Sequence, residues 1–196
     1  MHWLENIDQQ ILLAINGFGS PWADTFFWVV SMKLVWLPLY LLIFYFFGKI
    51  YGWKSLLMFV PLAILSVGMA DFISSGIIKE VVQRYRPSHH TQLGELLRFH
   101  QISEEHIYKG GQYGFVSGHA TNFAAVCTWM LLLFWKKLRW FAVVGIVAFV
   151  LTAYSRMYLG VHYLSDIIGG TIVGCSVVLL VYRLLFLRWI SKFTSE

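Results

Sequence analysis

The sequence alternates long apolar stretches with short polar segments. The apolar stretches cover residues 34–47, 56–78, 115–135, 140–159 and 164–187. Most of them come close to the roughly 20 residues that cross a bilayer as an α-helix. Lipid cannot form hydrogen bonds with unpaired backbone N–H and C=O groups. The stretches also lack the alternating polar and apolar residues of a membrane β-barrel strand, so helices are expected. The pattern predicts an all-α, polytopic transmembrane helical bundle.

The number of spans depends on where the first span begins. The stretch 34–47 is short on its own. Extending it back through Phe26, Phe27 and Trp28 gives enough length but includes Lys33, whose ammonium group must then reach the interface or face protein. We therefore expect five to six spans, and residues 20–48 decide the number.

The first 20 residues follow a different pattern, in which apolar and polar side chains fall on opposite sides of a helix. The apolar positions are Trp3, Leu4, Ile7, Ile11 and Leu12. The polar positions opposite them are Glu5, Asp8 and Gln9. Such a pattern is typical of a helix that lies in the membrane interface, and packing against the bundle is the alternative. We expect an interfacial helix over residues 1–20.

The composition agrees with a membrane protein. Of the 196 residues, 58% are hydrophobic and 13% are charged, whereas about 25% are charged in an average soluble domain. No polar linker divides the chain, so residues 1–196 are expected to form a single domain. The net charge of +5 comes from basic residues beside apolar stretches. It indicates membrane topology and an anionic ligand, and it argues against nucleic acid as a partner.

Small side chains inside the apolar stretches indicate packing. Cys127 and Cys175 lie within such stretches, where cysteine usually behaves as a small hydrophobic residue. No disulfide is expected from them. Gly170 and Gly174 have the spacing that lets two membrane helices approach closely.

Three groups of polar residues stand at the ends of apolar stretches. They are Lys79 with Arg86; Ser117, Gly118 and His119; and Ser155 and Arg156 followed by His162 and Asp166. Because successive spans reverse direction, all three groups are expected on the same membrane face. Their cations, histidines and carboxylate suit the binding and cleavage of a phosphate ester at a membrane surface.

Five of these residues have the chemistry of a phosphate-binding site. Arg86 and Arg156 offer planar forks of donors, and Lys79 offers a point charge. Ser117 and the backbone N–H of Gly118 would open a helix, and the start of a helix binds anions. We expect these five residues to hold the phosphate.

Two histidines and a carboxylate supply the catalytic groups. His162 and Asp166 are four residues apart and share a helix face, so Asp166 can hold one imidazole nitrogen and leave the other free for attack. His119 comes from another helix and suits the role of general acid. The expected reaction is attack of His162 on phosphorus, a phosphohistidine intermediate, and hydrolysis by water.

A metal site is the chemical alternative for the same three side chains. His119, His162 and Asp166 are possible metal ligands. The three nearby cations would repel a metal ion, however, so neither a metal nor another cofactor is expected.

Two further features lie near these groups. Asp71 falls inside the second apolar stretch, where a carboxylate is costly. We expect it to pair with a Ser, Tyr or Lys of a neighbouring helix, and a functional role is the alternative. Residues 88–114 join two of the polar groups and are expected to cover the site, with a plain loop as the alternative.

The basic residues predict the orientation in the membrane. Eight of the fifteen fall on the face opposite the polar groups: Lys49, Lys54, Lys136, Lys137, Arg139, Arg183, Arg188 and Lys192. The positive-inside rule makes that face cytoplasmic. We expect a multi-pass protein of the cell (inner) membrane, with a cytoplasmic C-terminus and a site that faces outward.

The order and spacing of the three groups resemble the signature of the type 2 phosphatidic acid phosphatase superfamily. The matching pattern is Lys79-x6-Arg86-Pro87, Ser117-Gly118-His119 and Ser155-Arg156-x5-His162-x3-Asp166. The resemblance implies metal-independent dephosphorylation of lipid phosphates or pyrophosphates. It implies His162 as nucleophile, Asp166 as its partner and His119 as acid. It also implies phosphate binding by Lys79, Arg86, Ser117, Gly118 and Arg156.

The sequence departs from the family signature at one position, and the signature does not identify the lipid substrate. Val116 stands where the family usually has proline, which removes a rigid helix start but no catalytic group. The small size and outward site resemble bacterial undecaprenyl pyrophosphate phosphatases, so undecaprenyl pyrophosphate is the expected substrate. Phosphatidylglycerophosphate and lipid A are alternatives, and a non-catalytic lipid-phosphate binder or transporter is an alternative of another class. The oligomeric state is left open.

Overall fold

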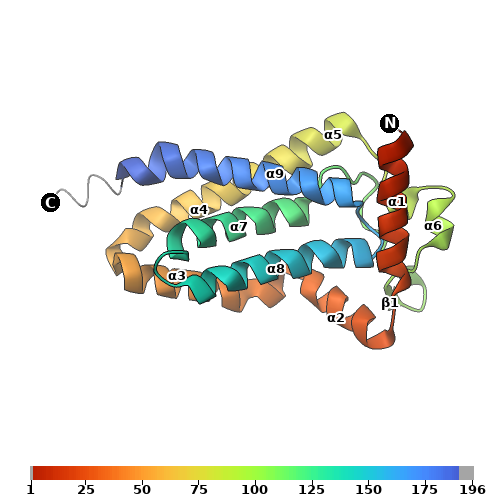
Figure 1. Ribbon diagram of the computed structural model, residues 1–196, viewed down its shortest axis with the longest axis horizontal. Helices are drawn as coiled ribbons and strands as arrows, with labels where there is room; N and C mark the ends of the chain where they lie inside the picture. Colours follow the sequence, from red (N-terminus) through yellow and green to blue (C-terminus); the bar gives the residue numbers. More distant parts are fainter. Residues whose placement is uncertain (1, 190–196) are drawn as a thin grey trace.

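In the computed structural model, which describes residues 2–189, five long helices form a bundle (Figure 1). They are α3 (Leu37–Tyr51), α4 (Leu56–Asp71), α7 (Gly118–Phe134), α8 (Arg139–Tyr158) and α9 (Leu164–Val181). Within the described residues, four helical segments are long and apolar enough to cross a membrane: Lys33–Tyr51, Trp53–Val82, Arg139–Tyr158 and Leu164–Trp189. Helix α7 is apolar and somewhat shorter. The predicted all-α transmembrane bundle is confirmed.

The residues before α3 form a separate helix. Helix α2 covers Pro21–Ser31, and its start is marked by Pro21 and by Ser20, whose hydroxyl accepts a hydrogen bond from the backbone N–H of Ala23 at 3.3 Å. Met32 is extended, and the short 3-10 helix η1 (Lys33–Trp36) then leads into α3. Helix α2 packs against α8. The first span therefore begins near Lys33, and residues 26–28 do not extend it.

The second span ends in irregular helix. A 3-10 turn, η2 (Trp53–Ser55), precedes α4. Helix α4 continues through a π-helical segment, η3 (Phe72–Ile78), into the short helix α5 (Lys79–Val82). Gln83 has a positive φ of 48° and ends the helix. The chain is extended beyond this point, and Tyr85 pairs with Tyr113 in an isolated β-bridge.

Helix α7 lies inside the bundle and contacts α4, α8 and α9. Its contact with α9 is very close at two glycines. A Cβ atom on Gly174 would lie 2.2 Å from the backbone oxygen of Thr121, and one on Gly170 would lie 2.6 Å from that of Ser117. The close helix approach predicted from these glycines is confirmed. It places the start of α9 beside the start of α7.

Helix α1 (His2–Gly17) lies across one end of the bundle (Figure 1). Asp8, Leu12 and Asn16 are buried, whereas Trp3 and Leu4 are exposed. The prediction that Asp8 and Leu12 lie on opposite faces of this helix is therefore wrong. Residues at this spacing share one side of a helix, and that side meets polar partners on α9 and the loops, described below.

The segment between α5 and α7 folds at the same end of the bundle as α1 (Figure 1). It contains η4 (Pro87–His89), α6 (Leu93–Leu96) and a small antiparallel pair, β1 (Gln101–Ser103) and β2 (His106–Ile107). Leu93 and Leu97 are buried in one cluster with Leu12 of α1. The side chain of Asn16 donates to the carbonyl of Arg98 at 2.9 Å and accepts its N–H at 2.8 Å. Helix α1 and this segment thus pack as one unit.

Candidate active site

The three polar groups predicted from the sequence meet at one end of the bundle. The backbone N–H of Ser117 donates to the backbone carbonyl of Asp166 at 2.9 Å, which joins the starts of α7 and α9. A guanidinium nitrogen of Arg86 lies 3.1 Å from the imidazole of His162, just after α8. The predicted convergence of these segments is therefore observed.

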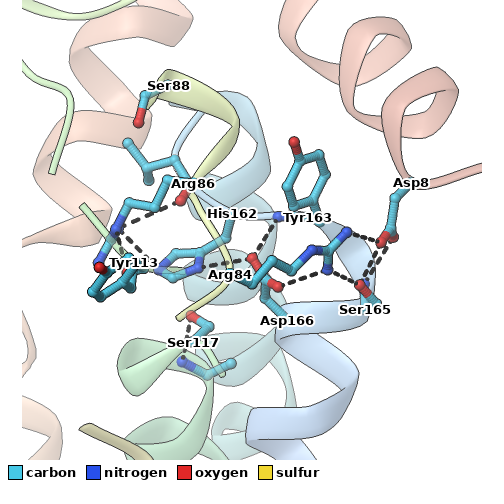
Figure 2. A network of polar contacts seen from close by, with 12 residues as sticks. Asp8, Arg84, Arg86, Ser88, Tyr113, Ser117, His162, Tyr163, Ser165 and Asp166 are labelled. Carbon is cyan, nitrogen blue, oxygen red and sulfur yellow. Dashed lines mark hydrogen bonds and ion pairs between the residues drawn. The ribbon is translucent and has the colours of Figure 1, made fainter. Parts of the chain in front are cut away.

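His162 and Asp166 form a buried pair (Figure 2). The Nδ1 atom of His162 lies 3.3 Å from Oδ2 of Asp166, and the two side chains are 1% and 0% exposed. The same carboxylate oxygen accepts the backbone N–H of Tyr163 at 3.0 Å, in a capping box at the start of α9. The cap fixes the carboxylate, and the carboxylate orients the imidazole.

The opposite edge of the imidazole, which carries Nε2, points to Arg86. Nη1 of Arg86 lies 3.1 Å from Nε2 of His162. An arginine N–H can only donate a hydrogen bond, so this contact favours an unprotonated Nε2 and a proton on Nδ1, toward Asp166. Burial, followed by the charges of Arg86, Arg156 and Lys79, lowers the pKa of His162 well below its usual value. Both the contact and the direction of this shift favour a neutral ring, with the Nε2 lone pair on the side of the cations.

Two arginines near His162 lack a carboxylate partner in the part of the chain that the structure describes. Arg86 donates to the carbonyls of Tyr113 at 3.0 Å and Val161 at 3.4 Å. Arg156 is 1% exposed and donates from Nη2 to the Tyr108 hydroxyl at 2.7 Å. Its Nε atom is buried with no hydrogen-bond partner among the described residues. A buried cation with a free donor is a suitable site for an anion.

Lys79 and Ser117 complete the predicted phosphate-binding set at this end. Lys79, in α5, lies within electrostatic range of Arg86 and Asp166. Ser117 is the N-cap of α7, and its hydroxyl accepts the backbone N–H of Ala120 at 3.4 Å. The helix therefore starts at Gly118, as predicted, although Val116 replaces the usual proline.

His119 connects this end of the bundle to an apolar cavity. It lies within electrostatic range of Arg156 and His162. It also lines a cavity of about 470 Å³ between α3, α4 and α7. Most of the remaining lining is apolar and includes Phe44, Phe59 and Val67. The cavity thus runs from a polar end at His119 into the region of the spans.

Asp71 has a partner, but of a different type from the one expected. Nδ2 of Asn122 in α7 donates to Oδ1 of Asp71 at 2.8 Å. The expectation of a Ser, Tyr or Lys partner is therefore wrong. A helix-to-helix amide serves the same purpose, because it satisfies a carboxylate within a membrane span.

Three residues at or next to the predicted groups were not predicted from the sequence to take part in the site. Arg84 forms ion pairs with both Asp8 and Asp166, and Tyr108 bonds to Arg156. Arg84 is two residues before Arg86 in an extended segment, so the two side chains share a face. That spacing was the available signal for Arg84. Nothing local in the sequence points to Asp8 or Tyr108.

Comparison with known proteins identifies the family. A model described as the PAP2 superfamily matches residues 56–190, which include all three polar groups. The chain belongs to the PAP2 superfamily. It is a membrane lipid phosphatase of PAP2 type, as the resemblance implied.

Several named relatives support this assignment. Lipid A 4′-phosphatase of Porphyromonas gingivalis is 33% identical over 97% of this chain and 79% of that protein. The enzyme of the same name from Bacteroides thetaiotaomicron is 32% identical over 89% of this chain and 75% of its own length. An undecaprenyl-diphosphatase from Sulfolobus acidocaldarius is 38% identical, but over only 34% of this chain and 31% of its own length.

A solved structure shows the same fold. It is the transmembrane PAP2-type phosphatidylglycerolphosphate phosphatase of Bacillus subtilis, with a TM-score of 0.64 and 23% sequence identity. The likeness covers 93% of this chain and 86% of that one. At this identity it supports the helical architecture alone.

Proposed function

We propose that this PAP2 phosphatase cleaves a lipid phosphate through His162. The observation that carries the proposal is the buried imidazole held between Asp166 at 3.3 Å and Arg86 at 3.1 Å. Nε2 attacks phosphorus, the bond from phosphorus to the leaving oxygen breaks, and His119 protonates that oxygen. Water then attacks the phosphohistidine and releases inorganic phosphate.

The cations and the start of α7 are proposed to hold the phosphoryl oxygens. Arg86 and Arg156 act as forks, Lys79 as a point charge, and Ser117 and Gly118 present the helix start. In the transition state, negative charge develops on the equatorial oxygens of the phosphoryl group. Hydrogen-bond donors that are already fixed in a site without water stabilise this charge most. The burial of Arg156, with its free Nε donor, supports this role.

For the substrate, we propose lipid A, with removal of its 4′-phosphate. Two relatives that bear the name lipid A 4′-phosphatase match nearly the whole chain. The apolar cavity next to His119 offers a place for a lipid chain, and its volume falls in the range of about 300–1,000 Å³ typical of ligand pockets. The phosphate would then lie at the polar end and the chain between α3, α4 and α7.

Undecaprenyl pyrophosphate is the second candidate. It is the substrate predicted from the sequence, and a relative named undecaprenyl-diphosphatase matches a third of the chain. This shorter match supports undecaprenyl pyrophosphate less than the matches over 97% and 89% of this chain support lipid A. Undecaprenyl pyrophosphate therefore stays a prediction, and the phosphate-release assay described below tests it.

The site is proposed to face away from the cytoplasm, in the cell (inner) membrane. Lys49, Lys54, Lys137 and Arg139 lie at or beside the ends of α3, α4, α7 and α8 that point away from α1 (Figure 1). Clusters of basic residues stay in the cytoplasm. Lys192, part of the same prediction, lies outside the described residues. A reporter fused after residue 192 should be cytoplasmic, and a periplasmic signal would reverse the orientation.

The activity is tested by phosphate release in detergent. Lipid A, phosphatidylglycerophosphate and undecaprenyl pyrophosphate are compared at equal concentrations, with EDTA present. We expect the highest kcat/KM with lipid A and no effect of EDTA. A clear preference for undecaprenyl pyrophosphate would replace the proposed substrate, and loss of activity with EDTA would overturn the metal-independent reaction.

The nucleophile is tested by His162→Ala with His106→Ala as the matched control. Removal of a catalytic nucleophile costs up to about 10⁶-fold in kcat, so we expect at least a ~10³-fold loss for His162→Ala. His106 is exposed in β2, and its variant should keep wild-type activity. Undiminished turnover by His162→Ala would rule out the proposed mechanism.

A further inference from the structure

A network of charged side chains connects the N-terminal helix to the His162–Asp166 pair (Figure 2). It comprises Asp8 of α1, Arg84 of the extended segment, and Ser165 and Asp166 at the start of α9. Figure 2 shows these side chains pointing toward one another on the side of Asp166 opposite His162. None of Asp8, Arg84 and Ser165 has a role in the mechanism above.

Arg84 holds the carboxylate oxygen that His162 does not contact. Nη1 of Arg84 donates to Oδ1 of Asp166 at 3.0 Å, whereas Oδ2 faces His162. Asp166 is fully buried, and a buried carboxylate needs a paired cation. With one oxygen on Arg84 and the other on the cap and the imidazole, the carboxylate has a single orientation.

Arg84 is itself fixed from several sides. Nη2 donates to Oδ2 of Asp8 at 2.9 Å, and Nη1 also donates to the Ser165 hydroxyl at 2.6 Å. The guanidinium stacks on the ring of Tyr163, 4.1 Å from its centre. A planar fork bonded to two carboxylates has little freedom to turn.

Asp8 ties this fork to α9. Its Oδ1 atom accepts the backbone N–H of Ser165 at 3.0 Å, and its Oδ2 atom accepts the Ser165 hydroxyl. Asp8 is 5% exposed. A carboxylate at a helix N-terminus is favoured by the free N–H groups and the helix dipole. Helix α1 therefore contributes a charge to the same helix end that carries Asp166.

Arg84 differs from the proposed phosphate-binding arginines in whether its positive charge is neutralised within the protein. Arg84 faces two carboxylates, so its charge is neutralised within the protein. Arg86 and Arg156 instead bond to carbonyls, an imidazole and a hydroxyl, and they keep their charge for an anion. A phosphate would gain little from Arg84.

We infer that Arg84 and Asp8 are positioning residues, which hold Asp166 against His162 and make helix α1 part of the device that orients the nucleophile. The inference rests on the proposed role of His162. Loss of the network should slow formation of the phosphohistidine while leaving substrate binding largely intact.

The test compares Asp8→Asn with Asp24→Asn. Asp24 also forms an ion pair with an arginine, Arg98 at 2.8 Å, but away from the His162–Asp166 pair. Loss of an outer partner of a catalytic group typically costs about 10- to 100-fold. We expect a kcat loss of that size for Asp8→Asn, with KM changed by less than about threefold. Asp24→Asn should keep the wild-type kcat.

Two more variants guard against simple misfolding. Ser165→Ala keeps all charges and removes only the hydroxyl between Asp8 and Arg84, so a smaller loss of kcat is expected. Asp8→Glu keeps the charge and should recover part of the kcat lost in Asp8→Asn. Rapid-quench measurement of the phosphoenzyme should show slower formation in Asp8→Asn, because the effect acts on the attacking imidazole.

The outcomes separate this inference from the proposed function. Wild-type kcat in Asp8→Asn, or a raised KM with unchanged kcat, overturns the positioning role. No recovery in Asp8→Glu together with a wild-type kcat in Ser165→Ala overturns it as well. Activity that survives in His162→Ala overturns the proposed function instead, whatever the Asp8 variants show.

Discussion

Replacing Gly174 with alanine should disturb both stability and catalysis, because the two helices that carry the site touch at this residue. A Cβ atom there would lie 2.2 Å from the backbone oxygen of Thr121 and 3.0 Å from the backbone nitrogen of Ala125. Ordinary contacts of a Cβ atom begin at 3.4 Å. The obstacle is backbone of α7, so it cannot move aside as a flexible side chain can.

The size of the displacement follows from these distances. To restore an ordinary contact, α9 must move from α7 by 3.4 − 2.2 = 1.2 Å. Gly174 is eight residues from Asp166, about 12 Å along the helix, and the hydrogen bond from Ser117 N–H to the Asp166 carbonyl is 2.9 Å long. A rigid shift of α9 would stretch that bond beyond hydrogen-bonding distance.

The expected result for Gly174→Ala is a loss of about 1–3 kcal/mol of stability, typical of overpacking. The turnover of lipid phosphate should fall in addition, since the starts of α7 and α9 separate. The measurements are the thermal unfolding midpoint in detergent and kcat for phosphate release.

Two glycine variants serve as controls. Gly145→Ala also adds a methyl group at a helix contact, but the atoms it meets belong to the flexible side chain of Met130, so a smaller effect is expected. Gly68 has no atom within 4 Å of the added position, and its replacement should stabilise the helix by up to ~1 kcal/mol. A Gly174→Ala protein with the midpoint and kcat of the Gly145→Ala protein would refute the reasoning.

Two further predictions concern the polar groups. Burial and nearby cations lower the pKa of His162. Its ring should therefore stay neutral as the pH falls to about 5.5, where free histidine, with a pKa near 6.5, is mostly protonated. The ¹⁵N chemical shifts of the ring report its protonation state. Tyr108→Phe removes the hydroxyl that Arg156 contacts at 2.7 Å, and a bond to a charged group contributes about 1.5–3 kcal/mol, so KM should rise by about tenfold or more with little change in fold.

Each of these predictions has a direct check. The His162 resonances are assigned by their disappearance in His162→Gln, and ¹⁵N shifts of a protonated ring near neutral pH would contradict the predicted neutral imidazole. For Tyr108, the comparison is Tyr85→Phe, since Tyr85 is exposed and, within residues 2–189, forms a backbone bridge and a ring contact with Tyr113. Equal KM values for the two variants would show that Tyr108 does not hold Arg156 for substrate binding.

Local pattern was sufficient for the spans and for most of the candidate site. Length and hydropathy marked the five bundle helices because a bilayer imposes both. The pair His162 and Asp166 was predicted from their spacing of four residues, but the expectation that both lie in one helix was wrong for His162, which stands just before the N-cap Tyr163 of α9. Gly170 and Gly174 were predictable, since close helix contacts require small side chains at that spacing.

The errors arose where a residue's partner lies far away in the chain. The apolar face of α1 was assigned from the periodicity of the sequence, which placed Asp8 on the opposite, polar face. In the fold, the buried side is the one with Asp8, Leu12 and Asn16, because its polar groups find partners on α9 and near Arg98. The separate helix α2 was missed as well: the chain is extended at Met32, and α2 packs against α8.

The sequence by itself thus determined the helical membrane fold, the meeting of three polar groups at one end, and a reaction class to match. Each follows from rules that act over one helix or one span. Only the tertiary structure decided which side of α1 is buried, that Arg84 joins Asp8 to Asp166, and that a cavity opens beside His119. These depend on how helices pack, because a buried charge is stable only where another element supplies its partner.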